Sequence, residues 1–237
     1  MTRILHTASI NPESIITIRG EELHYLSRVR RHKVADRVTV VDRDGNAFVA
    51  AITHIDRQQA TLRIEPDVPI SHAPPIFDVS LFVALPKGNI MDDIVRKLNE
   101  IGAMNLYPFH AARTCHRVSD SKVARWQRIA TESTRQCGRR IPLQVHPIRS
   151  FSDTIRCPEE TDIKLILHPT AAHTIIERIP GGTPVSILVG PEGGFTTGEV
   201  DLAQSIGFVP VKLETPILRI ETAAIASGVL AVALWNA

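Results

Sequence analysis

Residues 188–200, LVGPEGGFTTGEV, place three glycines directly after a short apolar run. Glycine-rich turns that follow a strand often cradle phosphates. Here Phe195 stands where a P-loop has its lysine, and a dinucleotide fingerprint would need its glycines earlier. The stretch therefore predicts a tight exit from a strand, or a turn whose backbone closely approaches another loop or a ligand without phosphates.

Residues 213–224, LETPILRIETAA, hold a second group of reactive side chains. Pro216 disfavours a continuing strand, and Glu221 followed by Thr222 is typical of a helix entry. Arg219 and Glu221 precede or begin that helix. They could form an ion pair that holds the loop, or a pair that orients or transforms a substrate, and their spacing leaves both interpretations open.

Two cationic clusters stand out in a nearly neutral chain. The stretch RVRRHK covers residues 28–33, and residues 113–149 carry many arginines opposed only by Asp120 and Glu132. If residues 121–139 are helical, one quarter of that helix presents Arg125, Arg128, Arg135 and Arg139. Such a stripe is either a solvated helix face or the footprint of a polyanion such as RNA.

Other chemistries find little support. The ten histidines form no HxxxH or HExxH pattern, so we expect no metal site. Ser186 and Ser205 lie in no nucleophile elbow. Cys115 beside His116 could suggest an activated thiol, although adjacent side chains usually point apart, and their roles stay open.

The cysteine count and the apolar segments suggest where the protein works. Three cysteines without a CxxC pair favour a reducing compartment, and we expect a cytoplasmic protein. No long apolar run near the N-terminus indicates a signal peptide. The C-terminal run AAIASGVLAVALW is shorter than the roughly 20 residues of a membrane span, so it predicts a buried helix.

The chain length favours two domains. Its 237 residues are 43% hydrophobic, and the formal charge is only +2. Four prolines between residues 66 and 75 make that stretch a good linker. We therefore expect one domain over residues 1–72 and a second over residues 73–237.

The first domain should be rich in β-structure. RVTVV and AFVAAITHI predict two strands joined by a turn at Asp44, Gly45 and Asn46, and ATLRIE predicts a third strand. The segment GEELHYLSRVRRHK, residues 20–33, predicts a short helix.

The second domain alternates between strand and helix patterns. Strands are expected at residues 77–85, 104–109, 162–168, 185–190 and 208–213, and helices at 91–102, 121–139 and about 221–234. Thr196 and Glu199 fit a capping box at the start of a further helix, and Gly207 can end that helix. This alternation predicts an α/β domain with a mostly parallel sheet covered on both faces, whose ligands sit at the carboxyl ends of the strands.

Together, ILVGPEGGFTTGEV and ILRIETAA resemble the knotted SPOUT-class methyltransferases, and within them the RsmE family of small-subunit ribosomal RNA uridine-N3 methyltransferases. LPKGNIMDDIVRKLNEIGAMNLYPFHAART, RWQRIATESTRQCGRRIPLQV and HYLSRVRRHKVADRVTVVDRDG are similar to further segments of that family. The resemblance covers nearly the whole chain. The chain departs from the family at Asn99 to Ala103 and at Pro216.

The resemblance implies an N-terminal PUA-like β-barrel that binds RNA and a C-terminal trefoil-knot domain. In that class S-adenosylmethionine sits bent between the loops of the knot. Carried over to this sequence, the expected cofactor-binding residues are Leu167, His168, Pro169, Val189, Gly190, Pro191, Glu192, Gly194, Leu213, Ile217, Leu218, Arg219, Thr222 and Ala223.

The resemblance also implies that the protein methylates 16S ribosomal RNA at N3 of a uridine during ribosome biogenesis. It implies a homodimer whose interface includes the apolar last helix.

Uridine N3 carries a proton, so the reaction needs a general base and a cation that stabilises the uracil anion. We expect Glu221 as the base, with Glu192 as the alternative, and Arg219 as the cation. Arg113 and Arg139 match family positions and would position RNA across the dimer interface. The expected RNA-binding residues are Arg28, Arg30, Arg31, Lys33, Arg113, Arg125, Arg128, Arg135 and Arg139.

Two other functions stay open. Related knotted enzymes methylate a ribose 2′-hydroxyl. A protein of this kind could also act as a non-catalytic RNA-binding or ribosome-assembly factor, although that would favour a degraded cofactor loop, and Gly190, Glu192, Gly193 and Gly194 are all present.

Overall fold

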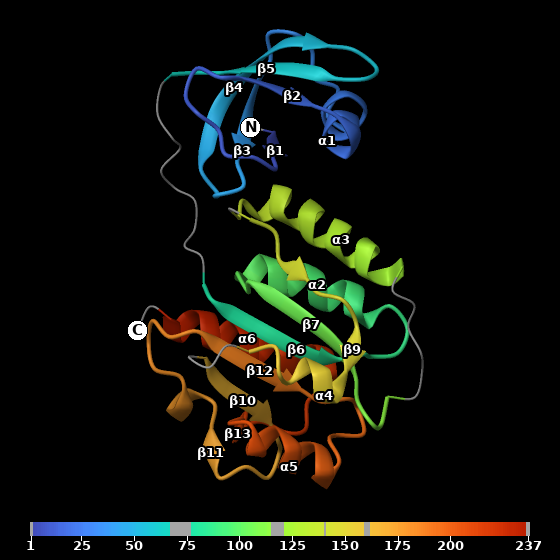
Figure 1. Cartoon of the computed structure of the whole chain (residues 1–237), viewed down its shortest axis with the longest axis vertical. Coiled ribbons are helices and arrows are strands. Elements are labelled where there is room, and N and C mark those ends of the chain that lie inside the picture. The colour runs from blue at the N-terminus through green and yellow to red at the C-terminus, as the bar shows by residue number, and fades with distance from the viewer. Residues whose placement is uncertain (1, 67–76, 115–120, 140, 159–161, 236–237) are drawn as a thin grey trace. The chain divides into compact units, whose positions relative to one another are not determined.

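The computed structural model describes residues 2–66, 77–114, 121–139, 141–158 and 162–235 (Figure 1). The chain forms two compact units, which are described separately. The first comprises Met1–Pro75 with Thr134–Ile141, and the second comprises Ile76–Ser133 with Pro142–Ala237. Most of the expected linker, and the expected boundary between residues 72 and 73, lie outside the described residues.

The first unit is built on a five-stranded sheet. Its strands run in the order β1 (Arg3–Leu5), β3 (Arg37–Val41), β4 (Ala47–Ile55), β5 (Ala60–Ile64) and β2 (Ile15–Ile18). β1 pairs parallel to β3, and the other neighbours are antiparallel. The predicted hairpin is confirmed: Asp42 Oδ1 accepts the N–H groups of Asp44 at 3.0 Å and Asn46 at 2.8 Å.

The predicted helix of the first unit is shorter than expected. α1 (Gly20–His24) continues into a π-helical turn (Tyr25–Val29), and Leu23 and Leu26 are buried in the core of this unit. The helix ends there because Arg31 adopts a left-handed conformation, with φ at 57°. The residues Arg30 to Lys33 therefore follow the helix instead of belonging to it.

The sheet of the second unit is entirely parallel among the described strands, as the alternation of elements predicted. Its order is β11 (His173–Thr174), β13 (Val209–Lys212), β10 (Ile163–Leu167), β12 (Val185–Val189), β6 (Val79–Ala84), β7 (Asn105–His110) and β8 (Gln144–Val145), and β9 (Arg149–Ser150) also pairs with β7. β6 and β12 are buried at every position. Central strands of a parallel sheet are buried in this way because both faces are covered.

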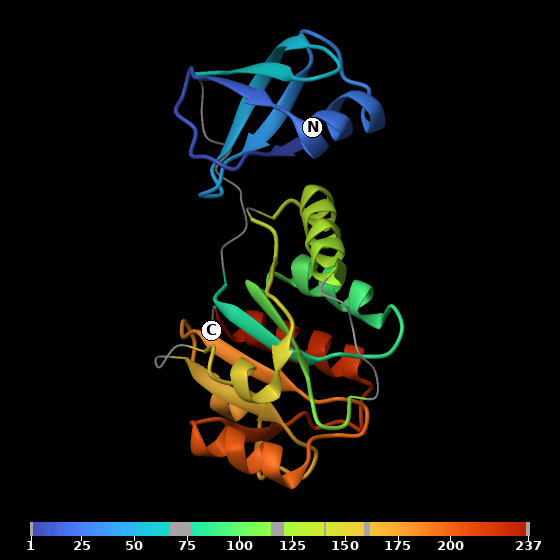
Figure 2. The ribbon, with the colours of Figure 1, turned by 45° about the vertical axis from the view of Figure 1, so that its right-hand side comes forward.

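The helices of the second unit are α2 (Ile90–Ile101), α4 (Phe151–Thr154), α5 (Thr197–Ser205) and α6 (Ile220–Trp235), with a 3-10 turn at Ile176–Arg178. α3 (Ser121–Cys137) belongs to the second unit up to Ser133 and to the first unit from Thr134. α2 and α6 pack against each other on one side of the sheet, and α4 lies on the other side (Figures 1 and 2). α2 ends at Gly102 with φ at 114°, as predicted. The predicted capping box at Thr196 and Glu199 is also confirmed.

Candidate functional site

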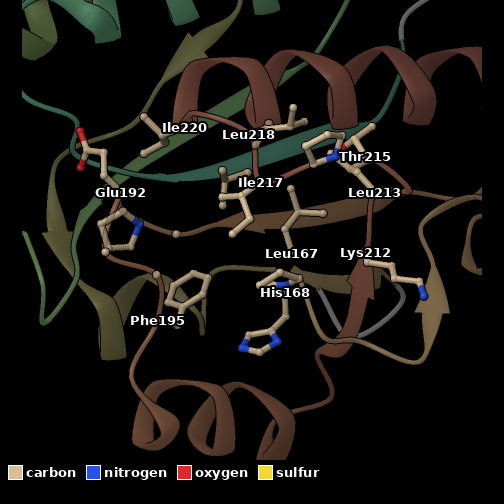
Figure 3. Close-up of a pocket in the computed structure, with 18 of the residues that line it drawn as sticks. Leu167, His168, Glu192, Phe195, Lys212, Leu213, Thr215, Ile217, Leu218 and Ile220 are labelled. Atoms are coloured by element: carbon tan, nitrogen blue, oxygen red, sulfur yellow. The ribbon is translucent and has the colours of Figure 1, made fainter.

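A cavity of about 430 Å³ opens at the carboxyl ends of β13, β10 and β12 (Figure 3). These strands are neighbours in the sheet, so the loops that follow them meet at one edge. The end of β10 and the loop after it contribute Leu167 to Pro169, the loop after β12 contributes residues 190–195, and the loop after β13 leads into the first turn of α6. The cavity therefore lies where ligands bind in open parallel sheets.

Most of the residues that the sequence assigns to the cofactor line this cavity. They are Leu167, His168, Pro169, Val189, Gly190, Pro191, Glu192, Gly194, Leu213, Ile217, Leu218 and Ala223. Arg219 and Thr222 lie outside the lining. The cavity is also lined by residues that the sequence did not assign to the cofactor. They are Arg113, Gly193, Phe195, Lys212, Thr215, Pro216 and Ile220. Most of them adjoin predicted segments, and Ile220 stands three residues before Ala223 on one helix face.

The walls of the cavity are mainly apolar. Leu167, Ile217 and Leu218 point toward its middle, whereas the Lys212 ammonium points away (Figure 3). Ile217 is 90% exposed, which is unusual for an isoleucine beside a buried strand end. An apolar side chain held open to solvent at a concave site favours a ligand with a flat apolar part.

Gly190 is required by the close approach of an aromatic ring. A Cβ atom at this position would lie 2.9 Å from the ring of Phe195. That ring is 8% exposed and stacks on Phe109 at 6.4 Å between centroids, with Phe151 at 5.8 Å. Because Phe195 belongs to the same loop, the tight exit from the strand is the interpretation, among those that the sequence left open, that explains Gly190.

The rest of the glycine-rich loop is a hydrogen-bonded turn. The Gly194 N–H donates to the carbonyl of Pro191 at 2.8 Å, and Gly194 has φ at 71°, a conformation that favours glycine. The turn carries Glu192 and Gly193 at its tip, and both line the cavity. The loop therefore presents its backbone and one carboxylate to a ligand.

Arg219 and Glu221 flank the start of α6. The Arg219 carbonyl accepts the N–H of Ala223 at 2.8 Å, and its side chain is exposed. Glu221 is half-buried in the first turn of the helix. Within the part of the chain that the structure describes, no ion pair joins the two side chains, so the ion-pair interpretation is not supported.

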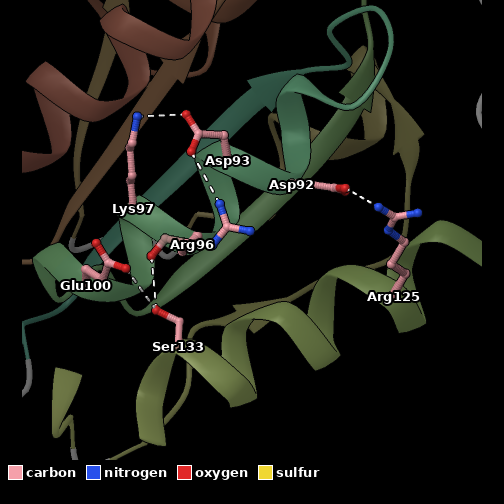
Figure 4. A network of polar contacts seen from close by, with 7 residues as sticks. All are labelled: Asp92, Asp93, Arg96, Lys97, Glu100, Arg125 and Ser133. Carbon is pink, nitrogen blue, oxygen red and sulfur yellow. Dashed lines mark hydrogen bonds and ion pairs between the residues drawn. The ribbon is translucent and has the colours of Figure 1, made fainter. Parts of the chain in front are cut away.

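The cations assigned to RNA on α3, and Arg139 just after this helix, lie in different surroundings. Arg125 and Arg128 are both exposed, and Arg125 Nη2 lies 2.5 Å from Asp92 Oδ2 (Figure 4). Arg135 pairs with Glu22 within the first unit, and the side chain of Arg135 is 9% exposed. Arg139 is buried, and this burial lowers its pKa to about 10.

The other assigned cations lie at the surface. Arg28, Arg30, Arg31 and Lys33 are all exposed, and Arg30 Nε donates to the Tyr25 hydroxyl at 2.9 Å. Arg113 is exposed as well, and it lines the cavity because its Nη1 donates to the carbonyl of Gly193 at 2.6 Å. The expected cluster at 28–33 is therefore open to a polyanion, whereas Arg113 contacts the glycine-rich loop.

Some predicted features have no structural counterpart in the described ranges. Cys115 and His116 lie outside them. Among described residues, no group of three or more His, Cys, Asp or Glu side chains is placed to hold a metal ion. None of the described helices combines the length and apolar character that crossing a membrane requires.

Comparison with protein families matches both parts of the chain. An RNA methyltransferase domain matches residues 72–232, and the PUA domain of RNA methyltransferases matches residues 18–65. The chain is 32% identical to the ribosomal RNA small subunit methyltransferase E of Synechocystis sp., covering 89% of this chain and 70% of the relative. The enzyme of the same name from Aquifex aeolicus is 28% identical, covering 89% and 90%.

Solved structures agree with these relatives. Ribosomal RNA small subunit methyltransferase E from Neisseria gonorrhoeae, bound to S-adenosyl methionine, superposes with a TM-score of 0.88 at 27% identity, covering 99% and 98% of the two chains. A methyltransferase from Legionella pneumophila, in complex with the same cofactor, gives a TM-score of 0.85 at 28% identity, covering 98% and 97%. The chain therefore belongs to the RsmE family, the ribosomal RNA small subunit methyltransferases E.

Proposed function

We propose that this protein transfers a methyl group from S-adenosylmethionine to N3 of a uridine in small-subunit ribosomal RNA. The observation that carries the proposal is the cavity at the ends of β13, β10 and β12. The segments that form it are the ones that the family resemblance assigned to the cofactor. The names and bound cofactor of the similar proteins support the same activity.

The residues of the cavity fit S-adenosylmethionine. Leu167, Leu213 and Leu218 offer apolar surface for the adenine ring, and the turn at residues 190–194 offers backbone polar groups at close range. The cofactor carries no phosphate, which agrees with a glycine-rich loop that has Phe195 in place of a lysine. When bound, it supplies a methyl group already activated on a sulfonium centre.

The protein must then activate the nucleophile. Uridine N3 is protonated, so a carboxylate must accept that proton while a cation stabilises the charge left on the uracil ring. We assign these roles to Glu221 and Arg219, which flank Ile220, a residue of the cavity lining at the start of α6. Glu192 is the alternative base, and it has the advantage of lining the cavity.

The RNA must reach this site with its target base unpaired, because N3 lies on the Watson–Crick edge. The exposed cations Arg28, Arg30, Arg31 and Lys33 in the first unit, and Arg128 on α3, provide positive charge for the phosphate backbone. We also propose a cytoplasmic homodimer that uses part of α6, on which Val229 is 46% exposed. The trefoil knot of the class is part of the same proposal.

Calorimetric titration of S-adenosylmethionine and S-adenosylhomocysteine into the purified protein tests the cofactor assignment. We expect saturable binding of both, and strong weakening in a Gly194→Val variant, since valine strongly disfavours the φ of 71° found there. Absence of binding to the wild-type protein would overturn the proposal and favour a non-catalytic RNA-binding role.

The position of the methyl group tests the target. Small-subunit RNA incubated with the protein and labelled cofactor is digested to nucleosides, and the label is located by mass spectrometry. We expect a uridine methylated at N3. A label on the ribose 2′-oxygen would instead assign the protein to the second activity found among knotted enzymes.

A further inference from the structure

The segment that follows β7 is tied by a buried carboxylate to the start of α5, directly after the glycine-rich loop. Glu199, at the start of α5, is 8% exposed. Its Oε2 accepts the N–H and the hydroxyl of Thr196 at 2.8 and 2.9 Å, which completes the capping box. Its Oε1 accepts the N–H of Ala112 at 2.8 Å, from a segment 87 residues away. A side chain needed only as a helix cap has no reason to make that last contact.

Arg113 connects the segment that follows β7 to the glycine-rich loop itself. Its Nη1 donates to the carbonyl of Gly193 at 2.6 Å and lies 3.5 Å from the carbonyl of Phe195. The stem of the side chain also packs on the loop, since Cδ would lie 3.3 Å from a Cβ at Gly193. Both carbonyls belong to residues that line the cavity. A charged donor on a main-chain carbonyl makes a stronger hydrogen bond than a neutral donor does.

The aromatic rings of Phe109 and Phe195 form a further contact between β7 and the glycine-rich loop. Phe109 is the next-to-last residue of β7, two residues before Ala111, and its ring stacks on that of Phe195 at an interplanar angle of 5°. The loop thus meets β7 and the segment after it through one ring pair and one guanidinium, and the Glu199 carboxylate fixes the residue that follows the loop. These three contacts of different kinds restrict the conformation of the loop.

We propose that Arg113 and Glu199 are positioning residues for the methyl donor, which hold residues 190–195 in the conformation that binds S-adenosylmethionine. This inference rests on the proposed cofactor. It gives Arg113 a role distinct from the RNA contact that the family resemblance implies, because its guanidinium is directed at the cofactor loop. The two roles predict effects on different ligands.

The experiment compares four variants with the wild-type protein. Arg113→Gln removes the charge and the planar donor, and Arg113→Lys keeps the charge but cannot reproduce the guanidinium geometry. Glu199→Gln can still cap α5 but turns one N–H group toward a backbone N–H, so either the cap or the Ala112 contact is lost. Arg178→Gln, an exposed arginine remote from the loop, is the matched control for the lost charge.

Two measurements separate the roles. The Kd for S-adenosylmethionine is measured by calorimetry without RNA, and the Kd for small-subunit ribosomal RNA is measured at several salt concentrations. We expect Arg113→Gln, Arg113→Lys and Glu199→Gln to raise the cofactor Kd about tenfold or more, which is the effect of losing one charge-assisted or buried hydrogen bond. Their RNA salt dependence should match that of Arg178→Gln.

Two outcomes would overturn the inference. The cofactor Kd of all three variants could stay within about twofold of the wild-type value, well below the tenfold effect of one lost hydrogen bond. Alternatively, Arg113→Gln could lower the RNA salt slope by about one while Arg113→Lys restores it, which is the signature of a phosphate contact. If the wild-type protein bound no cofactor, the proposed function itself would fail, and this result is distinct from both. Circular dichroism melting of each variant identifies any that fail to fold, and the remaining ones decide.

Discussion

The glycine-rich loop and the cationic face of α3 satisfy their polar groups in opposite ways. In the loop, a side chain from another segment binds the backbone, as Arg113 does at Gly193, and directly after the loop Glu199 of α5 joins Thr196 to Ala112. On α3, carboxylates from other elements bind the side chains, as Asp92 does at Arg125. The first arrangement fixes a shape, and the second cancels a charge.

This difference teaches how each region can act on a ligand. A loop whose backbone is bound by side chains of other segments presents a preformed surface to the ligand, so its function depends on its glycines. A helix whose arginines pair with carboxylates presents less net positive charge than its composition suggests. Its function therefore depends on how readily each arginine exchanges its carboxylate for a phosphate group of RNA. The four predictions below test the two sides in order of expected size.

The largest effect is expected for Arg219→Ala, on the cavity side. Arg219 lies outside the cavity lining and is exposed, so the variant should keep its cofactor affinity. Loss of a cation that stabilises developing charge should lower kcat by about 10² to 10³. Single-turnover methylation and calorimetry measure the two quantities. Collapse of cofactor binding with an unchanged chemical step would assign Arg219 to the cofactor instead.

Gly190→Val should weaken cofactor binding by about 5- to 150-fold, because overpacking of this size costs about 1–3 kcal/mol. The added Cβ would lie 2.9 Å from the ring of Phe195, and that ring is held by Phe109 and Phe151. Gly198→Ala is the control, since a Cβ there meets nothing within 4 Å. Equal cofactor affinities in the two variants would show that the ring does not constrain the loop.

Asp92→Ala should destabilise the protein by about 2–3 kcal/mol, since it leaves the indole N–H of a buried tryptophan without its acceptor. Asp92 Oδ1 accepts a hydrogen bond from Trp126 Nε1 at 3.0 Å, and Asp92 Oδ2 accepts one from Arg125. Asp93→Ala removes a neighbouring carboxylate that pairs only at the surface with Arg96 and Lys97 (Figure 4). That control should cost at most about 1 kcal/mol.

Urea unfolding with a common m-value measures both variants. Similar losses at Asp92 and Asp93 would mean that the contact between α2 and α3 adds nothing beyond a surface pair. In that case the carboxylate contacts of α3 would not differ in strength from an ordinary surface ion pair.

The smallest effect is expected for single arginines on RNA binding. Arg28→Gln in the first unit and Arg125→Gln on α3 change the net charge equally, so a difference between them reports direct contact. The exposed Arg28 should contribute about one unit to the salt slope of RNA affinity. Arg125, held 2.5 Å from Asp92, should contribute less than half as much. Equal slopes would show that RNA displaces Asp92 from Arg125.

Many elements of both units could be predicted because their signals are local. The apolar run of β12, the capping box at Thr196 and the stop at Gly102 each depend on a few adjacent residues. β1 has only three residues and β8 only two, and such short strands are decided by their partners. The helix at residues 20–33 was placed too long, because the left-handed conformation of Arg31 has no signal in its residue type.

The cavity could be predicted in outline but not in its supports. The loops after β10, β12 and β13 follow from the rule for parallel sheets and from the family motifs. Arg113 could not be assigned to the glycine-rich loop, because 80 residues separate it from Gly193. The contact between Gly190 and the Phe195 ring could not be predicted either. Phe195 stands in the same motif, but the sequence does not show that its ring is directed at Gly190.

The sequence by itself determined the two-part organisation, the parallel sheet, the family and most of the cofactor-binding segments. It could do so because periodicity, caps and motifs are properties of neighbouring residues. Only the tertiary structure decided which cations are paired, what Gly190 faces and which side chains hold the loop. Those outcomes depend on contacts between residues such as Arg125 and Asp92 or Ala112 and Glu199, and only folding brings these residues together.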